Sequence, residues 1–154
     1  MGNVLDINFD KESFDFIVVS GVVHHTPRPF KALDNLVYVL KKVGKMYLSI
    51  YNRNSFYFPE FYTIGHIFRF LHKYKMQRLL NFFIAPFQFA LRGISGENVS
   101  REHAQRIFAD RYLTPVASFH TNGQIREWCD KKGIKIIKKG TLKLGTLIWF
   151  LIEK

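Results

Sequence analysis

A strand–helix–strand pattern near the N-terminus constrains the fold more than any other feature of the sequence. Residues 14–20 contain the continuous apolar run Phe16–Val19, which ends at Ser20 and Gly21. An apolar run without polar alternation is typical of a strand that is buried on both faces, as in a parallel sheet. We therefore predict such a strand at residues 14–20.

A helix and a second strand follow. The helix is predicted to begin at Pro29, since proline suits the first turn, and to run to about Lys42, with Gly44 ending it. Its apolar residues follow the spacing of one helical face: Phe30, Leu33, Leu36, Val37 and Leu40. The second strand is Met46–Tyr51. Strand, helix and strand in this order form a βαβ unit, in which the strands are parallel and the crossover is right-handed.

The C-terminal part of the chain shows further regular patterns. Residues 121–124 predict the start of a helix that runs to Lys132 and ends at Gly133. Beyond it, residues 134–137 and Leu144–Ile152 predict an antiparallel pair of strands with a turn near Gly140.

The middle of the chain differs in composition. Residues 54–92 hold 12 of the 25 aromatic residues and five Lys or Arg against one acid, in a chain whose net charge is +11. Helices are predicted at 59–72 and 75–92, with Pro86 kinking or splitting the second. A third helix is predicted to begin after Ser100, which suits an N-cap, and to end near residue 109.

These elements predict an α/β fold. We expect a partial Rossmann-like sheet of about four strands, with parallel strands, a C-terminal antiparallel hairpin and helices on both sides. Residues 1–154 would form a single partial domain that carries a helical insertion at 54–110.

Composition excludes several classes of protein. Cys129 is the only cysteine, so an intrachain disulfide and a secreted cysteine framework are excluded. The N-terminus lacks the basic and apolar regions of a signal peptide. The longest apolar stretch, Leu79–Leu91, has 13 residues and contains Pro86, whereas a membrane-spanning helix needs about 20. We therefore expect a cytoplasmic protein, and contact with a membrane surface stays open.

Several segments are similar to the motifs of one enzyme family. Residues 2–9 (GNVLDINF), 13–27 (SFDFIVVSGVVHHTP) and 44–49 (GKMYLS) resemble the second half of a class I S-adenosylmethionine-dependent methyltransferase. Residues 118–121 (SFHT) and 125–134 (IREWCDKKGI) resemble the last helix of that family and the start of its final strands. The similarity is close at the N-terminal end and loose at the C-terminal end.

The resemblance implies S-adenosylmethionine as the cofactor. The family binds it with a glycine-rich loop after the first strand and an acid after the second, but residues 1–53 contain no G-x-G spacing. The chain would then be the C-terminal portion of a catalytic domain. A truncated gene, a late start or a split protein would explain the missing first half. We expect it to be an incomplete enzyme that binds the cofactor weakly or not at all.

The resemblance also assigns residues to the cofactor. Asn3 falls where the family has an acid that accepts from the adenine amino group, and the backbone of Val4 would lie against the adenine edge. Ser20, Gly21 and Val22 follow the first strand and would contact the methionine part. The alternatives are a frayed N-terminus and an ordinary strand-to-loop turn.

Histidines and a tyrosine are the candidates for chemistry. By the resemblance, His25 lines the cleft and would act as a general base; the alternative is a histidine that caps or packs the loop. His24, Tyr51, Arg53 and His120 are candidates for contact with the methyl acceptor. No metal site is expected, because adjacent histidines make poor joint ligands and no cysteine or carboxylate stands at ligand spacing.

The favoured function is S-adenosylmethionine-dependent methyl transfer to an acceptor that the sequence does not identify. The alternative is a non-enzymatic module, either a partner subunit or a degenerate homologue. The aromatic block at 56–92 would be a lid over a small-molecule or lipid-like acceptor, a surface for anionic lipid, or a helical subdomain with an ordinary aromatic core. Nucleic acid would suit the charge, but no recognition helix or aromatic platform supports it.

The strand at 14–20 is expected to need a partner. In the resembled fold, one neighbour of this strand is the family's first strand, which this chain does not contain. We therefore expect an exposed sheet edge that pairs with a separate N-terminal half or with a second copy of the chain.

Overall fold

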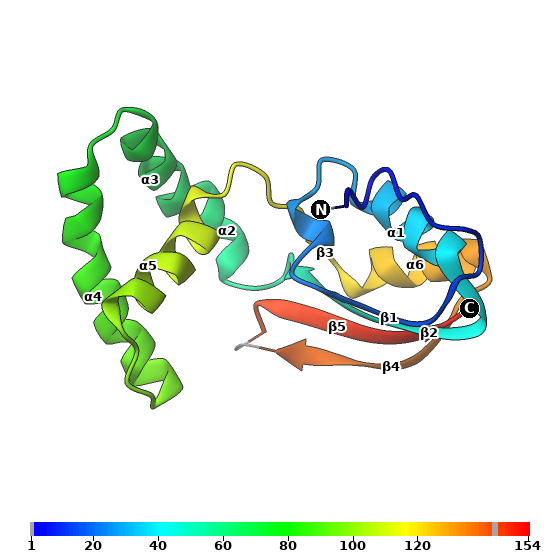
Figure 1. The fold of residues 1–154 in the computed structure, drawn as a ribbon. Helices are drawn as coiled ribbons and strands as arrows, with labels where there is room; N and C mark the ends of the chain where they lie inside the picture. Colours follow the sequence, from blue (N-terminus) through cyan, green and yellow to red (C-terminus); the bar gives the residue numbers. More distant parts are fainter. Residues whose placement is uncertain (1, 143–144) are drawn as a thin grey trace. The chain divides into compact units, whose positions relative to one another are not determined.

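The computed structural model describes residues 2–142 and 145–154 and divides the chain into two compact units. The first unit combines residues 1–58 and 116–154, and the second consists of residues 59–115. Figure 1 shows the sheet of the first unit and the helices of the second. The assignment of residues 54–110 as an insertion within a single partial domain stays a prediction.

The first unit is built on a mixed five-stranded sheet, and the α/β fold is confirmed. Its path runs β1 (Phe14–Ser20), β2 (Leu40–Asn52), β5 (Leu147–Glu153) and β4 (Lys135–Leu142), while the short β3 (Phe119–His120) pairs with β2 outside this path. β1 and β3 run parallel to β2, whereas β4 and β5 form an antiparallel hairpin. The sequence predicted the parallel pair and the hairpin but not β3.

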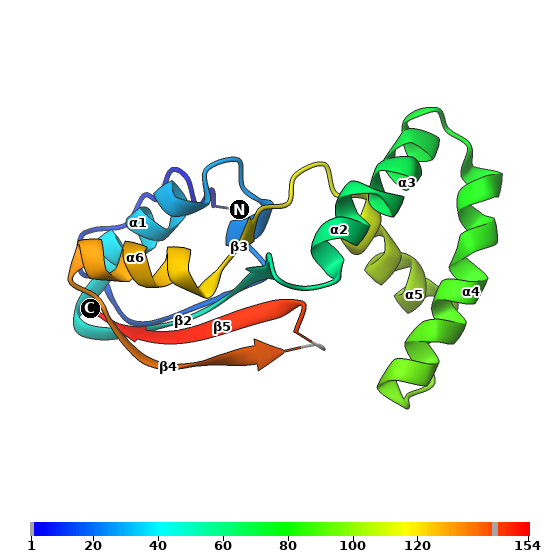
Figure 2. The same cartoon turned by 180° about the vertical axis from the view of Figure 1, so that it is seen from behind.

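Two helices cover one face of this sheet. α1 (Pro29–Val39) and α6 (Asn122–Lys132) lie on the same side in Figure 1, and Figure 2 shows this from behind. The core between them and the sheet contains Leu33 and Ile125 from the helices and Met46, Leu48 and Phe150 from the strands. Helices on both sides were expected, and within the first unit this expectation is wrong.

The opposite face of the sheet carries apolar side chains that remain accessible. Phe16 and Val18 of β1 are 53% and 64% exposed, although residues 14–20 were expected to be buried on both faces. The reason is that α1 and α6 both cover the other face of the sheet (Figure 1). β1 also pairs with β2 along one side only and forms an edge of the described sheet. The expectation of an exposed edge is therefore confirmed, and the expectation of burial on both faces is wrong.

α1 ends earlier than its periodicity indicates. Leu40 is already extended and fully buried, and the chain continues directly into β2. The expected helical end at Lys42 and the stop at Gly44 are therefore wrong. Sheet pairing takes over because Val43 donates its N–H to the carbonyl of Lys154, and Val43 adopts a left-handed φ of 61° at this point.

α6 follows its sequence signals closely. The side chain of Thr121 accepts from the backbone N–H of Gln124, and the side chain of Gln124 accepts from the backbone N–H of Thr121. This reciprocal pair is a capping box. Gly133 ends the helix at a φ of 67°, which glycine adopts without strain.

The hairpin turn does not lie at Gly140, and that prediction is wrong. Gly140 is inside β4, directly opposite Trp149 of β5. A Cβ at Gly140 would lie 2.7 Å from the indole Nε1 of Trp149, so glycine is required by the close approach of the ring. The turn comes after Leu142, and the predicted strand start at Leu144 lies outside the described residues.

The second unit is helical. It contains α3 (Ile64–Lys73), α4 (Gln77–Ser95), α5 (Arg101–Phe108) and a π-helical turn, η2 (Ala109–Leu113), and α2 (Tyr57–Tyr62) leads into it. The rings of Phe68, Phe108 and Tyr112 pack with Leu80 in an aromatic core. No helix among the described residues is long and apolar enough to span a membrane.

Two helix predictions in this unit need correction. The helix expected over 59–72 is interrupted at Thr63, whose hydroxyl donates to the carbonyl of Pro59. α4 runs continuously through Pro86, which therefore does not split it. The N-cap at Ser100 is confirmed, because its hydroxyl accepts from the backbone N–H of His103 at 3.1 Å.

Candidate functional site

The candidate site lies where the parallel strands end. β1 ends at Ser20, β2 ends at Asn52, and β3 ends at His120, which pairs in register with Asn52. The carboxyl ends of parallel strands are where open α/β sheets bind ligands. Residues from both ends of the chain therefore meet at this edge.

The loop after β1 is open to solvent. Ser20, Gly21 and Val22 are exposed, and Gly21 has a φ of 74°. No atom lies within 4 Å of the position that a Cβ on Gly21 would take. The loop then forms one turn of 3-10 helix, η1 (Val23–His25), which turns both histidines back toward the sheet. Its backbone leaves room for a bound group beside Gly21.

Three histidines and a tyrosine meet behind this loop. The ring of His24 lies 3.8 Å from the ring of Tyr51, centroid to centroid, and that of His25 lies 5.4 Å from it at a right angle. His24 and His25 are 4.5 Å apart. His120 is close enough for its charge to act on His24. We call these four residues the ring cluster.

Hydrogen bonds fix the tautomer of His25. Its Nδ1 lies 3.0 Å from the carbonyl oxygen of Val116, and a carbonyl only accepts, so Nδ1 carries the hydrogen. In the neutral ring, Nε2 then holds the lone pair. The hydroxyl of Tyr51 lies 3.4 Å from this Nε2 and is placed to donate to it. His25 therefore presents its basic nitrogen toward Tyr51.

His24 and His120 are buried with incomplete hydrogen bonding. His24 is 1% exposed, and Nδ1 of each ring has no hydrogen-bond partner among the described residues. Burial, together with the nearby His25 and His120, lowers the pKa of His24 to about 3. Burial also lowers the pKa of His120. Unpaired buried nitrogens and shifted pKa values in one cluster are typical of functional sites.

The segment before α6 anchors the ring cluster. Ser118 donates its backbone N–H to the carbonyl of His24 at 2.8 Å, and its hydroxyl lies 3.1 Å from Nε2 of His120. Phe119 stacks on Tyr51 with ring centroids 5.3 Å apart. Val116, Ser118 and Phe119 were not predicted as site residues. Their positions depend on the pairing of β3 with β2, which leaves no local pattern.

The remaining candidate residues lie apart from the rings. The side chain of Asn3 accepts a hydrogen bond from the N–H of Leu5, and the carbonyl of Val4 accepts one from the side chain of Asn35. Both N-terminal residues are therefore engaged in local contacts. The guanidinium of Arg53 lies over the ring of Phe58 at 5.5 Å, and the residue is exposed. Its backbone N–H donates to the carbonyl of His120, so the start of this loop is tied to β3.

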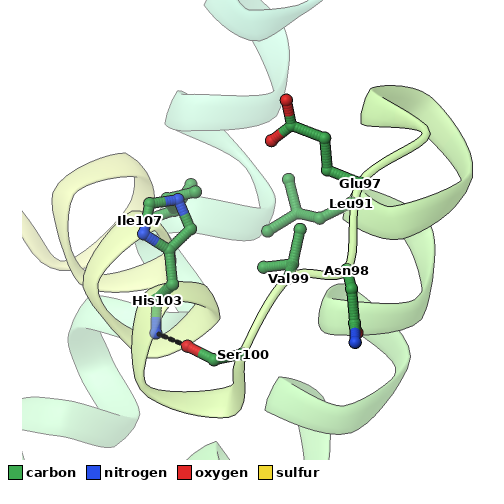
Figure 3. A pocket seen from close by; sticks show the side chains of 7 residues that line it. All are labelled: Leu91, Glu97, Asn98, Val99, Ser100, His103 and Ile107. Carbon is green, nitrogen blue, oxygen red and sulfur yellow. Dashed lines mark hydrogen bonds between the residues drawn. The ribbon is translucent and has the colours of Figure 1, made fainter.

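Two surface hollows lie outside the ring cluster. One, of about 310 Å³, runs beside β1 and is lined by apolar residues of β1, α1 and the N-terminal segment, among them Phe16, Val18 and Leu36. The other, of about 360 Å³, lies between α4 and α5 in the second unit. Figure 3 shows its lining, in which Ser100 caps α5 through the N–H of His103. None of the predicted site residues lines either hollow.

Comparison with known proteins supports the resemblance found in the sequence. Residues 1–48 match the family model of a methyltransferase domain. No curated protein sequence matches the chain.

Solved structures share the fold over almost the whole chain. An S-adenosylmethionine-dependent methyltransferase of Thermotoga maritima is 15% identical with a TM-score of 0.58, covering 99% of this chain and 62% of its own. A Haloferax volcanii complex between the activator Trm112 and a protein assigned as a methyltransferase is 10% identical with a TM-score of 0.59, covering 99% of this chain and 58% of its own. A Burkholderia thailandensis 1,6-didemethyltoxoflavin-N1-methyltransferase with bound S-adenosylhomocysteine is 11% identical with a TM-score of 0.51, covering 98% of this chain and 48% of its own.

The chain thus spans less than two thirds of the length of these structures. At these identities the similarity is one of fold. Together with the family match over residues 1–48, it confirms what the motifs indicated: the chain resembles the class I S-adenosylmethionine-dependent methyltransferases.

Proposed function

We propose that the chain takes part in S-adenosylmethionine-dependent methyl transfer, with the loop after β1 on the cofactor side and the ring cluster on the acceptor side. The ring cluster is the observation that carries this proposal. Its buried, incompletely bonded histidines stand at the carboxyl ends of β1, β2 and β3, where this fold class binds ligands.

The residues present fit the methionine part of the cofactor. The exposed loop at Ser20–Val22 offers backbone groups, and open space beside Gly21 leaves room for a bound molecule. S-adenosylmethionine, when bound, would supply a methyl group on a sulfonium. The adenine end fits less well, since the side-chain oxygen of Asn3 already accepts from Leu5.

His25 is the candidate general base. Its Nε2 holds the lone pair in the neutral tautomer, so it could take the proton that an O–H or N–H acceptor loses when the methyl carbon leaves the sulfonium sulfur and bonds to the acceptor's oxygen or nitrogen. Tyr51 would orient this nitrogen through its hydroxyl. His24, with its pKa lowered to about 3, stays neutral and would offer a ring nitrogen to the acceptor without adding charge. Arg53 and His120 complete the proposed acceptor side.

Cross-linking tests this assignment without knowledge of the acceptor. The chain would be irradiated with ultraviolet light in the presence of methyl-tritiated S-adenosylmethionine and then digested. We expect label in the peptide that holds residues 20–28, and unlabelled S-adenosylhomocysteine should suppress it. Competable label confined to other peptides would contradict the proposed site, as would an absence of competable label.

A second candidate function, as one subunit of a larger assembly, has its own support. β1 leaves one side unpaired in the described sheet, and the apolar hollow beside it continues onto α1. One protein of similar fold is found in a complex with a methyltransferase activator. In this alternative the edge of β1 takes up a further strand, and the chain contributes an interaction surface rather than a complete active site.

A further inference from the structure

The hairpin that joins α3 to α4 has an unusual surface. We call residues 70–83 the helical tip: they comprise the last turn of α3, the loop 74–76 and the first two turns of α4. Every residue from His72 to Leu79 is exposed. Within the loop, Lys75 adopts a φ of 56°, which reverses the chain. The helical tip is therefore a projection of the second unit that is accessible along its whole loop.

Large apolar side chains dominate this surface. Phe82 is 72% exposed. The other large apolar residues exposed on the helical tip are Phe70, Tyr74, Met76, Leu79 and Phe83. The rings of Phe70 and Tyr74 lie 4.6 Å apart, and those of Phe82 and Phe83 lie 5.6 Å apart. A water-facing surface rarely concentrates so many aromatic rings without a binding role.

The outermost ring, Phe82, belongs to a different face of α4 from the core of the unit. α4 buries Leu80 in the cluster with Phe68 of α3 and Tyr112 of η2, whereas Phe82 and Phe89 remain exposed. Phe83 lies between the two faces, with its ring 5.1 Å from that of Phe68. α4 thus carries an inner apolar face and an outer one. The inner face accounts for the folding of the unit, and the outer face is left for a partner.

The charge of the helical tip is uniformly positive. Residues 61–96 contain no Asp or Glu, while Lys73, Lys75 and Arg78 stand exposed among the rings. No ion pair with another described residue holds these three side chains. Basic residues beside exposed aromatic residues match the two layers of a membrane surface, anionic headgroups above and acyl chains below.

We propose that the helical tip docks on an anionic lipid bilayer, with Phe82 and its aromatic neighbours entering the interface and Lys73, Lys75 and Arg78 contacting the headgroups. A bilayer accounts for both features of the surface. Nucleic acid would use the cations, but it would leave the apolar side chains of Met76, Leu79 and Phe82 without a counterpart. No membrane-spanning helix is needed, because docking of this kind is peripheral.

Co-sedimentation with vesicles tests the proposal. The full chain is mixed with vesicles of phosphatidylcholine alone or of phosphatidylcholine with phosphatidylglycerol. We expect binding to the anionic vesicles that weakens with salt. Replacing Lys73, Lys75 and Arg78 together by glutamine should lower the partition coefficient by about 100-fold, from about fivefold for each charge. Phe82→Ser should lower it by about tenfold or more.

Matched substitutions elsewhere serve as controls. Phe56→Ser removes a phenylalanine that is 93% exposed but lies outside the helical tip, and Lys138→Gln with Lys139→Gln removes two exposed lysines of β4. Both control proteins should bind as the parent does, and circular dichroism should show all variants folded. Equal binding to the two kinds of vesicle would overturn the proposal. So would control variants that lose as much binding as the tip variants, or an oligonucleotide that displaces the vesicles while Phe82→Ser has no effect.

Discussion

Acid should destabilise the first unit through His24, and the size of the effect follows from its burial. The pKa of His24 is lowered from 6.5 to about 3 by burial and by neighbouring His25 and His120. A histidine whose pKa is depressed by folding stays neutral in the native state while the unfolded chain takes up a proton. The free energy of unfolding is therefore not reduced by His24 above pH 6.5, and it decreases as the pH falls from 6.5 toward 3.

The loss of free energy of unfolding is already large at moderately acid pH. At about pH 5 the unfolded histidine is almost fully protonated and the native one is not, which costs about 2 kcal/mol relative to neutral pH. That is a large part of the free energy of unfolding of a typical domain, about 5–15 kcal/mol. His120 adds to the loss in the same direction, since burial lowers its pKa too.

Urea unfolding at about pH 5 and pH 7.5 measures this loss. Both tryptophans, Trp128 and Trp149, lie in the first unit, so their fluorescence reports on that unit. His24→Phe keeps a ring against Tyr51 and removes the titration, so the pH dependence should shrink by about 2 kcal/mol. His66→Gln is the control, because it removes a histidine of α3 in the second unit, on which the tryptophans do not report. An equal pH dependence in the parent and in His24→Phe would mean that folding does not lower the pKa of His24.

Two further predictions concern the sheet. Gly140→Ala should destabilise the first unit by about 1–3 kcal/mol in the same assay, because its Cβ would lie 2.7 Å from Nε1 of Trp149. Gly123→Ala, in α6 with nothing closer than 3.7 Å, should instead be neutral or stabilising, and a loss of similar size at both glycines would contradict the argument. The edge of β1 should pair with a second copy when the chain is purified alone, so light scattering should give a dimer or larger species. Val18→Lys should shift the species seen by light scattering toward the monomer. A monomeric parent chain with rapidly exchanging amides along residues 16–19 would show that the edge needs no partner.

Local patterns were sufficient for the elements whose signals are local. The strand at 14–20, the start of α6 at residues 121–124 and its end at Gly133 each depend on a few neighbouring residues, and the structure has all three. The end of α1 was missed because Leu40 pairs with Phe14 of β1 and its carbonyl accepts a hydrogen bond from the side chain of Lys154, and neither contact is local in the sequence. Gly140 was misread as a turn for a similar reason, since its requirement comes from a ring on the neighbouring strand.

The candidate site shows the same division. His25 could be singled out by the resemblance, whereas His24 follows a predicted strand and Tyr51 ends one. Their meeting depends on the pairing of β3 with β2 and on hydrogen bonds from Ser118, 94 positions after His24. The buried state of His24, and thus its pKa, is a product of that long-range packing. No periodicity within the sequence encodes it.

A titration of the isotopically labelled chain with S-adenosylhomocysteine will show whether the loop after β1 contacts the cofactor. Amide resonances in a two-dimensional NMR spectrum would be followed residue by residue. We expect weak binding with shifts concentrated at Gly21, Val22 and the adjoining His24 and His25, and a Gly21→Val variant should lose those shifts. Amides of this loop that stay unshifted, or shifts confined to the hollow lined by Leu91, would mean that the cofactor does not contact the loop after β1.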